Sequence, residues 1–176
     1  MLVEEALRRH DLVERMLAEH ARRARDVERH FRLLRRTLGL RKVFMDVGAG
    51  DCALAHRVAG YVERAYAVDT SEEVLRALRR PGNVVALRAE GAGIPVPAGT
   101  VDVAFSRELI AQRLPAIHRA LAPGGRYLCL APGSCLETLA AAGFRKLRAY
   151  ARVAGWYARL PFPLDRRLGA CIEAMK

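Results

Sequence analysis

Short apolar runs alternate with segments of helical pattern from residue 43 onward, and this alternation constrains the fold more than any other feature of the sequence. The runs are too hydrophobic for strands with one face in water, so we expect a sheet that helices cover on both sides. The expected strands are residues 43–47, 65–69, 84–88, 101–106 and 126–131. The expected helices are residues 51–60, 71–80, 115–121 and 134–142. The pattern therefore predicts an α/β domain with a mostly parallel sheet.

The last part of the chain breaks this alternation. Residues 144–152 and 156–160 both have strand pattern, and only a few residues around Gly155 separate them. So short a link has no room for a crossover helix, which predicts that these two strands pair antiparallel. We therefore expect a three-layer sandwich whose sheet has seven strands, mostly parallel, with an antiparallel last strand.

Residues 2–38 have helical pattern, with no proline and with no glycine before Gly39. Apolar side chains recur there at spacings of three and four residues and form one stripe: Ala24, Val27, Phe31, Leu34 and Leu38. The sequence thus predicts two parts, an N-terminal helical extension over residues 1–40 that can act as a lid and a domain over residues 41–176. We also expect the N-terminal helices to offer a surface for a homo-oligomer.

Length and composition exclude several classes of protein. The chain has 176 residues, of which 52% are hydrophobic and 28% charged, and this excludes wholesale disorder. Its apolar runs fall short of the roughly 20 residues that cross a bilayer, and the N-terminus is charged from Glu4 onward, unlike a secretory signal. We expect a cytoplasmic protein without membrane contact. Its four cysteines, reduced in that compartment, lack the spacing of a zinc site, so no metal is expected.

The formal net charge of +11 is concentrated at the two ends of the chain. Residues 1–42 carry 12 basic and 7 acidic side chains, and residues 127–176 carry 8 and 3. Basic flanks of this kind can attract RNA or another polyanion. The same charge also fits arginines spread over solvated helix faces, so the pattern leaves RNA binding open.

One segment carries the clearest chemical signal. The expected strand at 43–47 runs into Gly48-Ala-Gly50, and a helical pattern follows. Glycines at these positions allow a tight turn and let a ligand approach the backbone closely. Asp69 lies 19 residues beyond Gly50, at the end of the second expected strand. A carboxylate there can accept hydrogen bonds from the hydroxyls of a ribose, so the sequence predicts a site for a nucleoside cofactor.

Two kinds of cofactor fit this signal. Gly48-x-Gly50-x-x-Ala53 followed by Asp69 fits the permissive form of the dinucleotide-binding fingerprint. Against a dinucleotide, Asp46 precedes the first glycine by two residues, where its carboxylate would face a pyrophosphate unfavourably. The chain also has no room for a separate substrate domain of the size that dehydrogenases carry.

The second kind of cofactor follows from a resemblance to the class I S-adenosylmethionine (SAM)-dependent methyltransferases. Asp46-Val-Gly48-Ala-Gly50-Asp-Cys52 resembles the glycine loop of that family, with Cys52 in place of the last glycine. Three further segments resemble family motifs in the same order: 68–71 at the ribose-binding strand end, 90–102 around the adenine, and 121–126 at the Pro-Gly-Gly turn. The resemblance covers about residues 40–160 and implies a Rossmann-like fold with SAM as cofactor.

The resemblance also implies roles for individual residues. Asp46 would help to hold the cationic methionine end of SAM, Asp69 would bind the ribose, and Glu90 would meet the adenine amino group. The whole set of cofactor-binding residues expected from it is Asp46, Gly48, Ala49, Gly50, Asp69, Thr70, Glu90, Gly91 and Ser106.

The sequence assigns no catalytic residue and no acceptor. Methyl transfer needs in-line positioning of two bound reactants, and it needs a base only where the nucleophile carries a proton at neutral pH. Arg107 could meet an anionic acceptor, Glu108 could act as a base or be an exposed acid, and His30 could lie over the cofactor if the N-terminal helix is a lid. We expect methyl transfer to a small molecule or to RNA. A non-catalytic SAM-binding or partner-binding module and a small nicotinamide-binding protein remain the alternatives.

Overall fold

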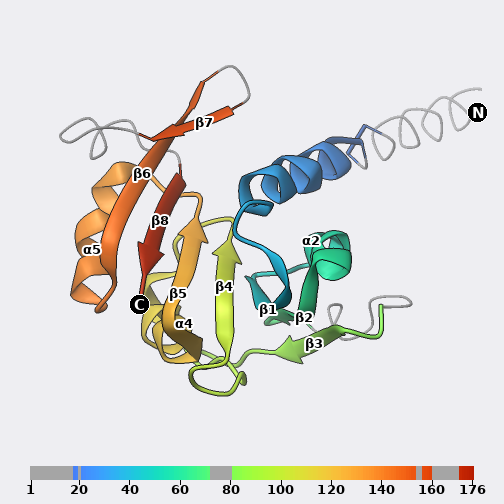
Figure 1. Cartoon of the computed structure of the whole chain (residues 1–176), viewed down its shortest axis with the longest axis horizontal. Helices are drawn as coiled ribbons and strands as arrows, with labels where there is room; N and C mark the ends of the chain where they lie inside the picture. Colours follow the sequence, from blue (N-terminus) through green and yellow to red (C-terminus); the bar gives the residue numbers. More distant parts are fainter. Residues whose placement is uncertain (1–17, 20, 72–80, 154–155, 160–170) are drawn as a thin grey trace, which may run out of the picture.

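One sheet organises the chain in the computed structural model, which describes residues 18–19, 21–71, 81–153, 156–159 and 171–176 (Figure 1). Its strands are β1 (Gly39–Val47), β2 (Val62–Asp69), β3 (Val84–Arg88), β4 (Val101–Ser106), β5 (Leu121–Cys129), β6 (Arg145–Val153), β7 (Trp156–Arg159) and β8 (Cys171–Met175). Their order across the sheet is β3-β2-β1-β4-β5-β8-β6-β7. Strands β1 to β5 pair in parallel, whereas β8 is antiparallel to both β5 and β6.

The expected fold class is confirmed. The order β3-β2-β1-β4-β5-β8-β6 gives the mostly parallel, seven-stranded sheet of a Rossmann-like sandwich, and the short strand β7 extends its edge. The antiparallel pairing predicted near Gly155 is present between β6 and β7. Sequence patterns did not predict β8, and they placed the starts of β1 and β5 too late. Both strands begin early because pairing extends them, Gly39 with Val62 and Leu121 with Val101.

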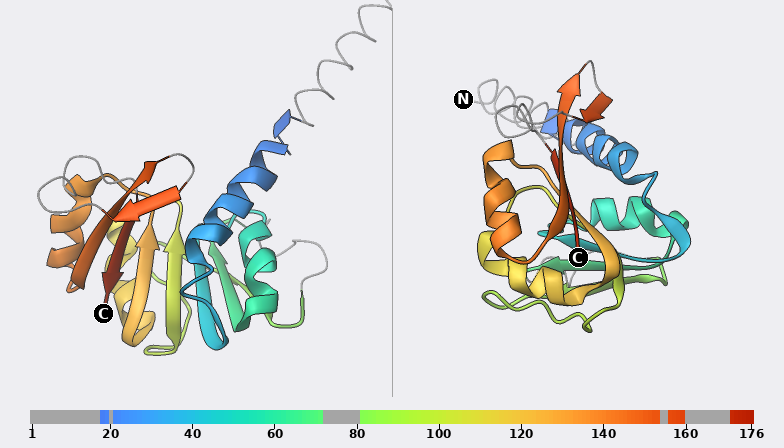
Figure 2. Two further views of the ribbon diagram at one scale, coloured as in Figure 1. Left: turned by 45° about the horizontal axis from the view of Figure 1, so that its top comes forward. Right: turned by 60° about the vertical axis from the view of Figure 1, so that its left-hand side comes forward.

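Helices cover the two faces of the sheet (Figure 2). The N-terminal helix, residues 21–34, and α2 (Ala53–Val58) lie on one face, whereas α4 (Leu114–Ala120) and α5 (Leu136–Ala141) lie on the other. Single 3-10 turns flank them: η1 (Ala59–Tyr61), η2 (Ala111–Arg113) and η3 (Gly133–Cys135). The helix expected at 71–80 lies almost wholly outside the described residues, as does the first part of the expected N-terminal helix. None of the helices described is both long and apolar enough to cross a membrane.

Each face of the sheet buries its own apolar core. On the face that α4 and α5 cover, the core includes Met45, Val47, Tyr127 and Ile172 of the strands with Ile117 of α4 and Leu139 of α5. Residues on the opposite face include Phe44, Leu54, Val58, Phe105 and Leu128, together with Phe31 and Leu34 from the N-terminal helix. The apolar stripe predicted at 24–38 therefore packs, through its central members, against the sheet and α2.

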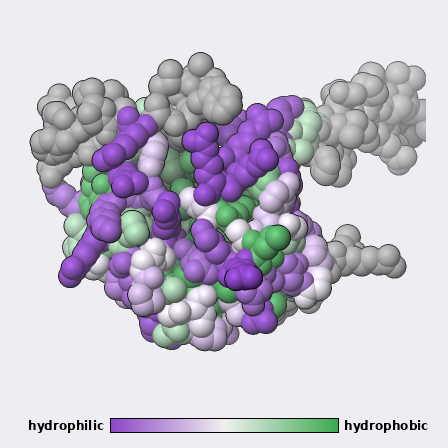
Figure 3. Space-filling view, in the orientation of Figure 1, coloured by the Kyte–Doolittle hydropathy of each residue, from purple (hydrophilic) through white to green (hydrophobic). Residues whose placement is uncertain are grey.

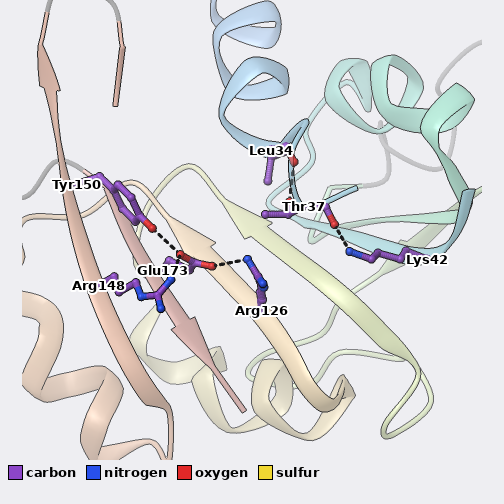
Figure 4. Close-up of polar contacts among 7 residues, drawn as sticks. All are labelled: Leu34, Thr37, Lys42, Arg126, Arg148, Tyr150 and Glu173. Carbon is purple, nitrogen blue, oxygen red and sulfur yellow. Dashed lines mark hydrogen bonds and ion pairs between the residues drawn. The ribbon is translucent and has the colours of Figure 1, made fainter. Parts of the chain in front are cut away.

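Polar contacts fix the end of the N-terminal helix. The Thr37 hydroxyl donates to the Leu34 carbonyl at 2.6 Å, and the Lys42 ammonium donates to the Thr37 carbonyl at 2.6 Å (Figure 4). The Leu34 carbonyl also accepts the Thr37 N–H at 2.7 Å, so backbone and side-chain donors together satisfy carbonyl groups at the C-terminus of the helix. The turn at 35–37 then leads directly into β1, which starts at Gly39.

A second polar cluster lies on strands β5, β8 and β6, on the same face of the sheet as the N-terminal helix (Figure 4). The nearly buried Glu173 carboxylate accepts from Arg126 Nη1 at 3.0 Å and from the Tyr150 hydroxyl at 2.6 Å. Arg148 Nη1 lies 4.0 Å from the same carboxylate. Figure 3 shows that hydrophilic side chains dominate this side of the molecule, with apolar side chains visible between them.

Candidate functional site

The glycine loop between β1 and α2 forms the floor of the candidate site. Gly48 and Gly50 have φ angles of 78° and 57°, which side-chain-bearing residues rarely adopt. The N–H groups of Gly48 and Ala49 both donate to the Val68 carbonyl, at 2.8 and 3.1 Å. A Cβ atom built on either glycine would meet nothing within 4 Å. The loop is therefore held tightly from below and lies open above, as a backbone surface for a ligand requires.

Cys52 stands where the sequence resemblance expects a third glycine. Its backbone is left-handed, with φ 60°, and the residue is fully buried at the start of α2. A left-handed conformation costs a non-glycine residue roughly 1–2 kcal/mol. The site thus keeps the glycine-like backbone at this position even though its residue is cysteine.

Asp69 joins the loop to the end of β2. One carboxylate oxygen accepts from the Gly50 N–H at 2.8 Å, and the other accepts from the Ser71 N–H at 3.0 Å. A carboxylate oxygen has two lone pairs, so each retains capacity for a further donor such as a ribose hydroxyl. The half-exposed side chain can therefore shape the loop and bind a ligand at once.

Asp46 is the most unusual residue of the site. It is fully buried, and neither carboxylate oxygen has a hydrogen-bond partner among the described residues. Burial raises the pKa of Asp46 to about 7; the positive charge of Arg107 opposes this rise, and the carboxylates of Asp69 and Asp51 add to it. A buried polar group without a partner is costly, so the arrangement favours a ligand that brings a cationic donor to Asp46.

The next expected residues lie beyond β2 and β3 at the same edge of the sheet. Thr70 is exposed directly after Asp69. The Glu90 side chain is 83% exposed, with its carboxylate 4.0 Å from Arg88 Nε. Gly91 has a φ of 55°, has open space where a Cβ would lie, and accepts from Arg113 Nε at 3.2 Å through its carbonyl. The structure thus brings these residues to the carboxyl edge that carries the glycine loop.

Ser106 was also expected to bind the cofactor, but its side chain does not point toward the other predicted cofactor-binding residues. It pairs with Val47 across β4 and β1, so its side chain lies on the opposite face of the sheet from that of Asp46. The buried hydroxyl lies 2.6 Å from the Tyr127 hydroxyl and donates to the Glu108 carbonyl at 2.5 Å. These contacts give the Ser106 side chain a structural role in joining β4 to β5.

Two residues that the sequence singled out only as possibilities lie near the site. The buried His30 ring, from the N-terminal helix, packs at 5.2 Å between centroids from the Phe105 ring on β4. Burial, and next to it the charge of Arg107, lower the pKa of His30 to about 4. Asp46 and Phe105 are register partners, so the His30 ring packs on the face that also carries the Asp46 side chain, and Arg107 directly follows β4.

The sequence matches one family model. A model described as a methyltransferase domain matches residues 45–129, which include the glycine loop, Asp69 and Glu90. No curated protein matches the sequence. The match runs from the last residues of β1 to the end of β5, the part of the sheet whose strands are parallel.

Solved structures share the fold. A SAM-dependent methyltransferase from Mesorhizobium loti aligns with a TM-score of 0.63 and 16% identity, over 84% of this chain and 98% of that one. The tRNA (m1A58) methyltransferase of Aquifex aeolicus aligns with a TM-score of 0.59 and 18% identity, over 85% and 68%. Phosphoethanolamine N-methyltransferase 2 of Haemonchus contortus, solved with S-adenosylhomocysteine, aligns with a TM-score of 0.59 and 17% identity, over 68% and 37%. At these identities the likeness concerns the fold alone.

Proposed function

We propose that this chain, which belongs to the class I SAM-dependent methyltransferases, holds SAM on the glycine loop at the carboxyl edge of β1 and β2. One observation carries the placement of the cofactor: a fully buried carboxylate without a partner, Asp46, lies beside a glycine loop with open space above it. SAM has an ammonium group, and it has no phosphate that this carboxylate would repel.

The residues of the edge fit the parts of the cofactor one by one. Asp46 would take the ammonium group, and Asp69 would bind the ribose through the lone pairs that Gly50 and Ser71 leave free. Glu90, with the Gly91 N–H, would meet the adenine. When bound, SAM supplies an electrophilic methyl group on a sulfonium sulfur.

The chain's own contribution to the reaction would be binding, orientation and exclusion of water. Holding a nucleophile in line with the methyl group converts an encounter between two molecules into a step within one complex, which lowers the barrier by several kcal/mol. The N-terminal helix, which packs Phe31 onto α2 and His30 onto Phe105, would act as the lid over the acceptor.

Calorimetry with S-adenosylhomocysteine tests this proposal directly. We expect binding, and we expect a proton to be released near pH 7 because an ammonium group at Asp46 favours the ionised carboxylate. Two buffers with different heats of ionisation measure that proton, and Asp46→Asn should remove it. A crystal structure with S-adenosylhomocysteine bound away from the glycine loop would refute the placement, and binding without turnover on a broad acceptor panel would indicate a non-catalytic module.

A second candidate, an RNA acceptor, draws on the charge of the N-terminal helix. The helix and the turn after it carry four exposed arginines that have no ion pair in the described part of the chain: Arg22, Arg25, Arg35 and Arg36. RNA binding through such side chains weakens steeply with salt. Fluorescence anisotropy with a short RNA at several salt concentrations tests this candidate, with the quadruple glutamine variant as the comparison.

A further inference from the structure

Three side chains from separate elements lie on the face of the sheet that the N-terminal helix covers. Asp46 of β1 and Phe105 of β4 are register partners, so their side chains point to the same face. His30 packs its ring on Phe105, with an angle of 44° between the planes. The charge of Arg107, just past the end of β4, acts on both Asp46 and His30. The group thus lies between the candidate cofactor site and the N-terminal helix.

Arg107 differs from other arginines that lie near the sheet. Arg57 pairs with Glu28 at 3.0 Å, and Arg113 and Arg119 donate to backbone carbonyls at 3.2 and 2.9 Å. Within the described residues, Arg107 has neither an ion pair nor a hydrogen bond, although its charge reaches the buried carboxylate of Asp46. An exposed guanidinium without a partner, one residue beyond the end of β4, is available to pair with an anion from outside.

His30 is neutral at physiological pH. Burial is the main cause of its lowered pKa, and the charge of Arg107 is the next. Asp26 and Arg29 on its own helix also face it, with opposite effects, and they pair with each other at 2.8 Å, so their influences largely offset. No described residue hydrogen-bonds to the imidazole. A neutral imidazole has one nitrogen that can accept a proton.

We propose that Arg107 and His30 form the acceptor subsite, and that the acceptor carries a carboxylate or phosphate group close to an N–H or O–H nucleophile. The guanidinium pairs with the anion, and the imidazole accepts the proton of the nucleophile. This inference rests on the proposed function. In the step, a bond forms between the nucleophile and the methyl carbon as the carbon–sulfur bond of SAM breaks. The electron pair of that bond stays on sulfur, which becomes a neutral thioether, and the proton ends on His30.

This arrangement links anion binding to the strength of the base. An anion on Arg107 neutralises the charge that disfavours protonated His30, so the pKa of His30 should rise toward its ordinary value. The imidazole then becomes a better proton acceptor when an acceptor of the right charge is bound. An acceptor without an anionic group would leave His30 a weak base.

Nuclear magnetic resonance of the imidazole groups of the full chain tests the subsite, with inorganic phosphate as the probe. Titrations with and without 100-fold excess of S-adenosylhomocysteine follow each histidine, and His30→Gln assigns the His30 signals. We expect phosphate to raise the pKa of His30 by about half a unit or more. Arg107→Gln should abolish that response, and Arg145→Gln, at an exposed arginine at the start of β6, should leave it intact. His118, which packs on Phe144 on the other face of the sheet, is the internal control.

Several results would overturn the assignment. A His30 signal that phosphate does not move, or that moves equally in Arg107→Gln, removes the anion site. A tenfold or greater loss of S-adenosylhomocysteine affinity in Arg107→Gln, measured by calorimetry, places Arg107 in the cofactor site instead. Failure of the wild-type chain to bind S-adenosylhomocysteine contradicts the proposed function, and the phosphate titration without nucleoside still reports on Arg107 and His30. Acetate in place of phosphate separates a carboxylate site from a phosphate site.

Discussion

The Gly50 N–H donates to the Asp69 carboxylate at 2.8 Å, across 19 positions of sequence. This contact ties the left-handed glycine of the loop to the end of β2, and the Ser71 N–H holds the other carboxylate oxygen at 3.0 Å. Asp69 therefore has a structural role, and under the proposed function the same side chain also binds the ribose. Its removal should disturb both, and the two effects are separable by measurement.

Asp69→Ala should weaken the binding of S-adenosylhomocysteine by at least roughly 1–3 kcal/mol, because the ribose loses a charged hydrogen-bond acceptor. The glycine loop also loses its anchor, so the loss should lie at the upper end of that range. Isothermal titration calorimetry at pH 7.5 measures the change.

Asp102→Ala provides the matched control for Asp69→Ala. The Asp102 carboxylate also accepts a backbone N–H, that of Val43 at 2.8 Å, but it lies near the start of β4, away from the carboxyl edge that carries the glycine loop. The variant should lower the free energy of unfolding by about 1–2 kcal/mol and leave nucleoside affinity unchanged. Equal affinity losses in the two variants would mean that Asp69 acts only through the stability of the fold.

The sequence predicted the glycine loop and Asp69 because each depends on a local pattern, a glycine pair after an apolar strand and an acid after the next strand. It did not predict the face on which Ser106 lies, because that depends on the register of β4 with β1. It missed β8 because Glu173 interrupts the apolar run. That residue is tolerated in a buried strand only because β5 and β6 bring Arg126 and Tyr150 to it.

The two glycines of the Pro-Gly-Gly turn in β5, Gly124 and Gly125, are needed for different reasons. Gly124 has a φ of 76°, as expected for a turn glycine. Gly125 is needed for a different reason, because a Cβ there would lie 2.9 Å from the carbonyl oxygens of both Ala122 and Val101. The first requirement is local and can be read from sequence. The second comes from the close approach of the start of β4, which only the folded structure shows.

Asp46 should make stability fall as pH rises. The folded-state pKa of its carboxyl is about 7, above the ordinary value of 3.8, so its stabilising contribution is present below about pH 4 and is lost as pH rises to about 7. We therefore compare the free energy of unfolding of Asp46→Asn with that of wild type at each pH. Between pH 5 and pH 8 this difference should shift in favour of the variant by on the order of a few kcal/mol. Urea unfolding at the two pH values measures the difference.

His30 gives the control for the Asp46 experiment, because its pKa moves in the opposite direction. Its folded-state pKa is lowered from 6.5 to about 4, so its contribution is present above pH 6.5 and is lost as pH falls toward 4. His30→Gln should thus stabilise the chain at pH 5 relative to pH 8. A pH slope that both variants leave unchanged would show that neither group titrates with folding.

The contact between Phe31 and Arg57 should hold the N-terminal helix on α2. The Arg57 guanidinium carbon lies 3.6 Å from the Phe31 ring centroid, and Phe31 is 3% exposed. Phe31→Ala should cost about 3–5 kcal/mol, because a large buried side chain is lost. Arg57→Ala should cost about 1 kcal/mol, since the cation is partly solvated. Limited trypsin digestion should cleave the arginine-rich helix faster in both variants.

Arg32→Ala is the matched control, because Arg32 also pairs with Glu28, at 3.4 Å, but has a 75% exposed side chain and no aromatic partner. It should change stability by no more than about 0.5 kcal/mol. If Arg57→Ala and Arg32→Ala behave alike in digestion and unfolding, the stacking on Phe31 contributes nothing to the docking of the helix.

Glu173 should be a determinant of stability that is independent of the cofactor site. Its side chain is 7% exposed and accepts from Arg126 and Tyr150, which lie on the strands at either side of β8. Glu173→Ala should cost about 2 kcal/mol, because the Tyr150 hydroxyl loses its acceptor and Arg126 its carboxylate. Tyr150→Phe should cost about 1 kcal/mol. Arg148→Ala should cost less than about 1 kcal/mol, because that arginine is 4.0 Å away and 42% exposed.

Urea unfolding ranks the three variants, and calorimetry should find wild-type affinity for S-adenosylhomocysteine in each. A cost for Arg148→Ala as large as that for Glu173→Ala would show that long-range charge, rather than the two short hydrogen bonds, secures β8 in the sheet.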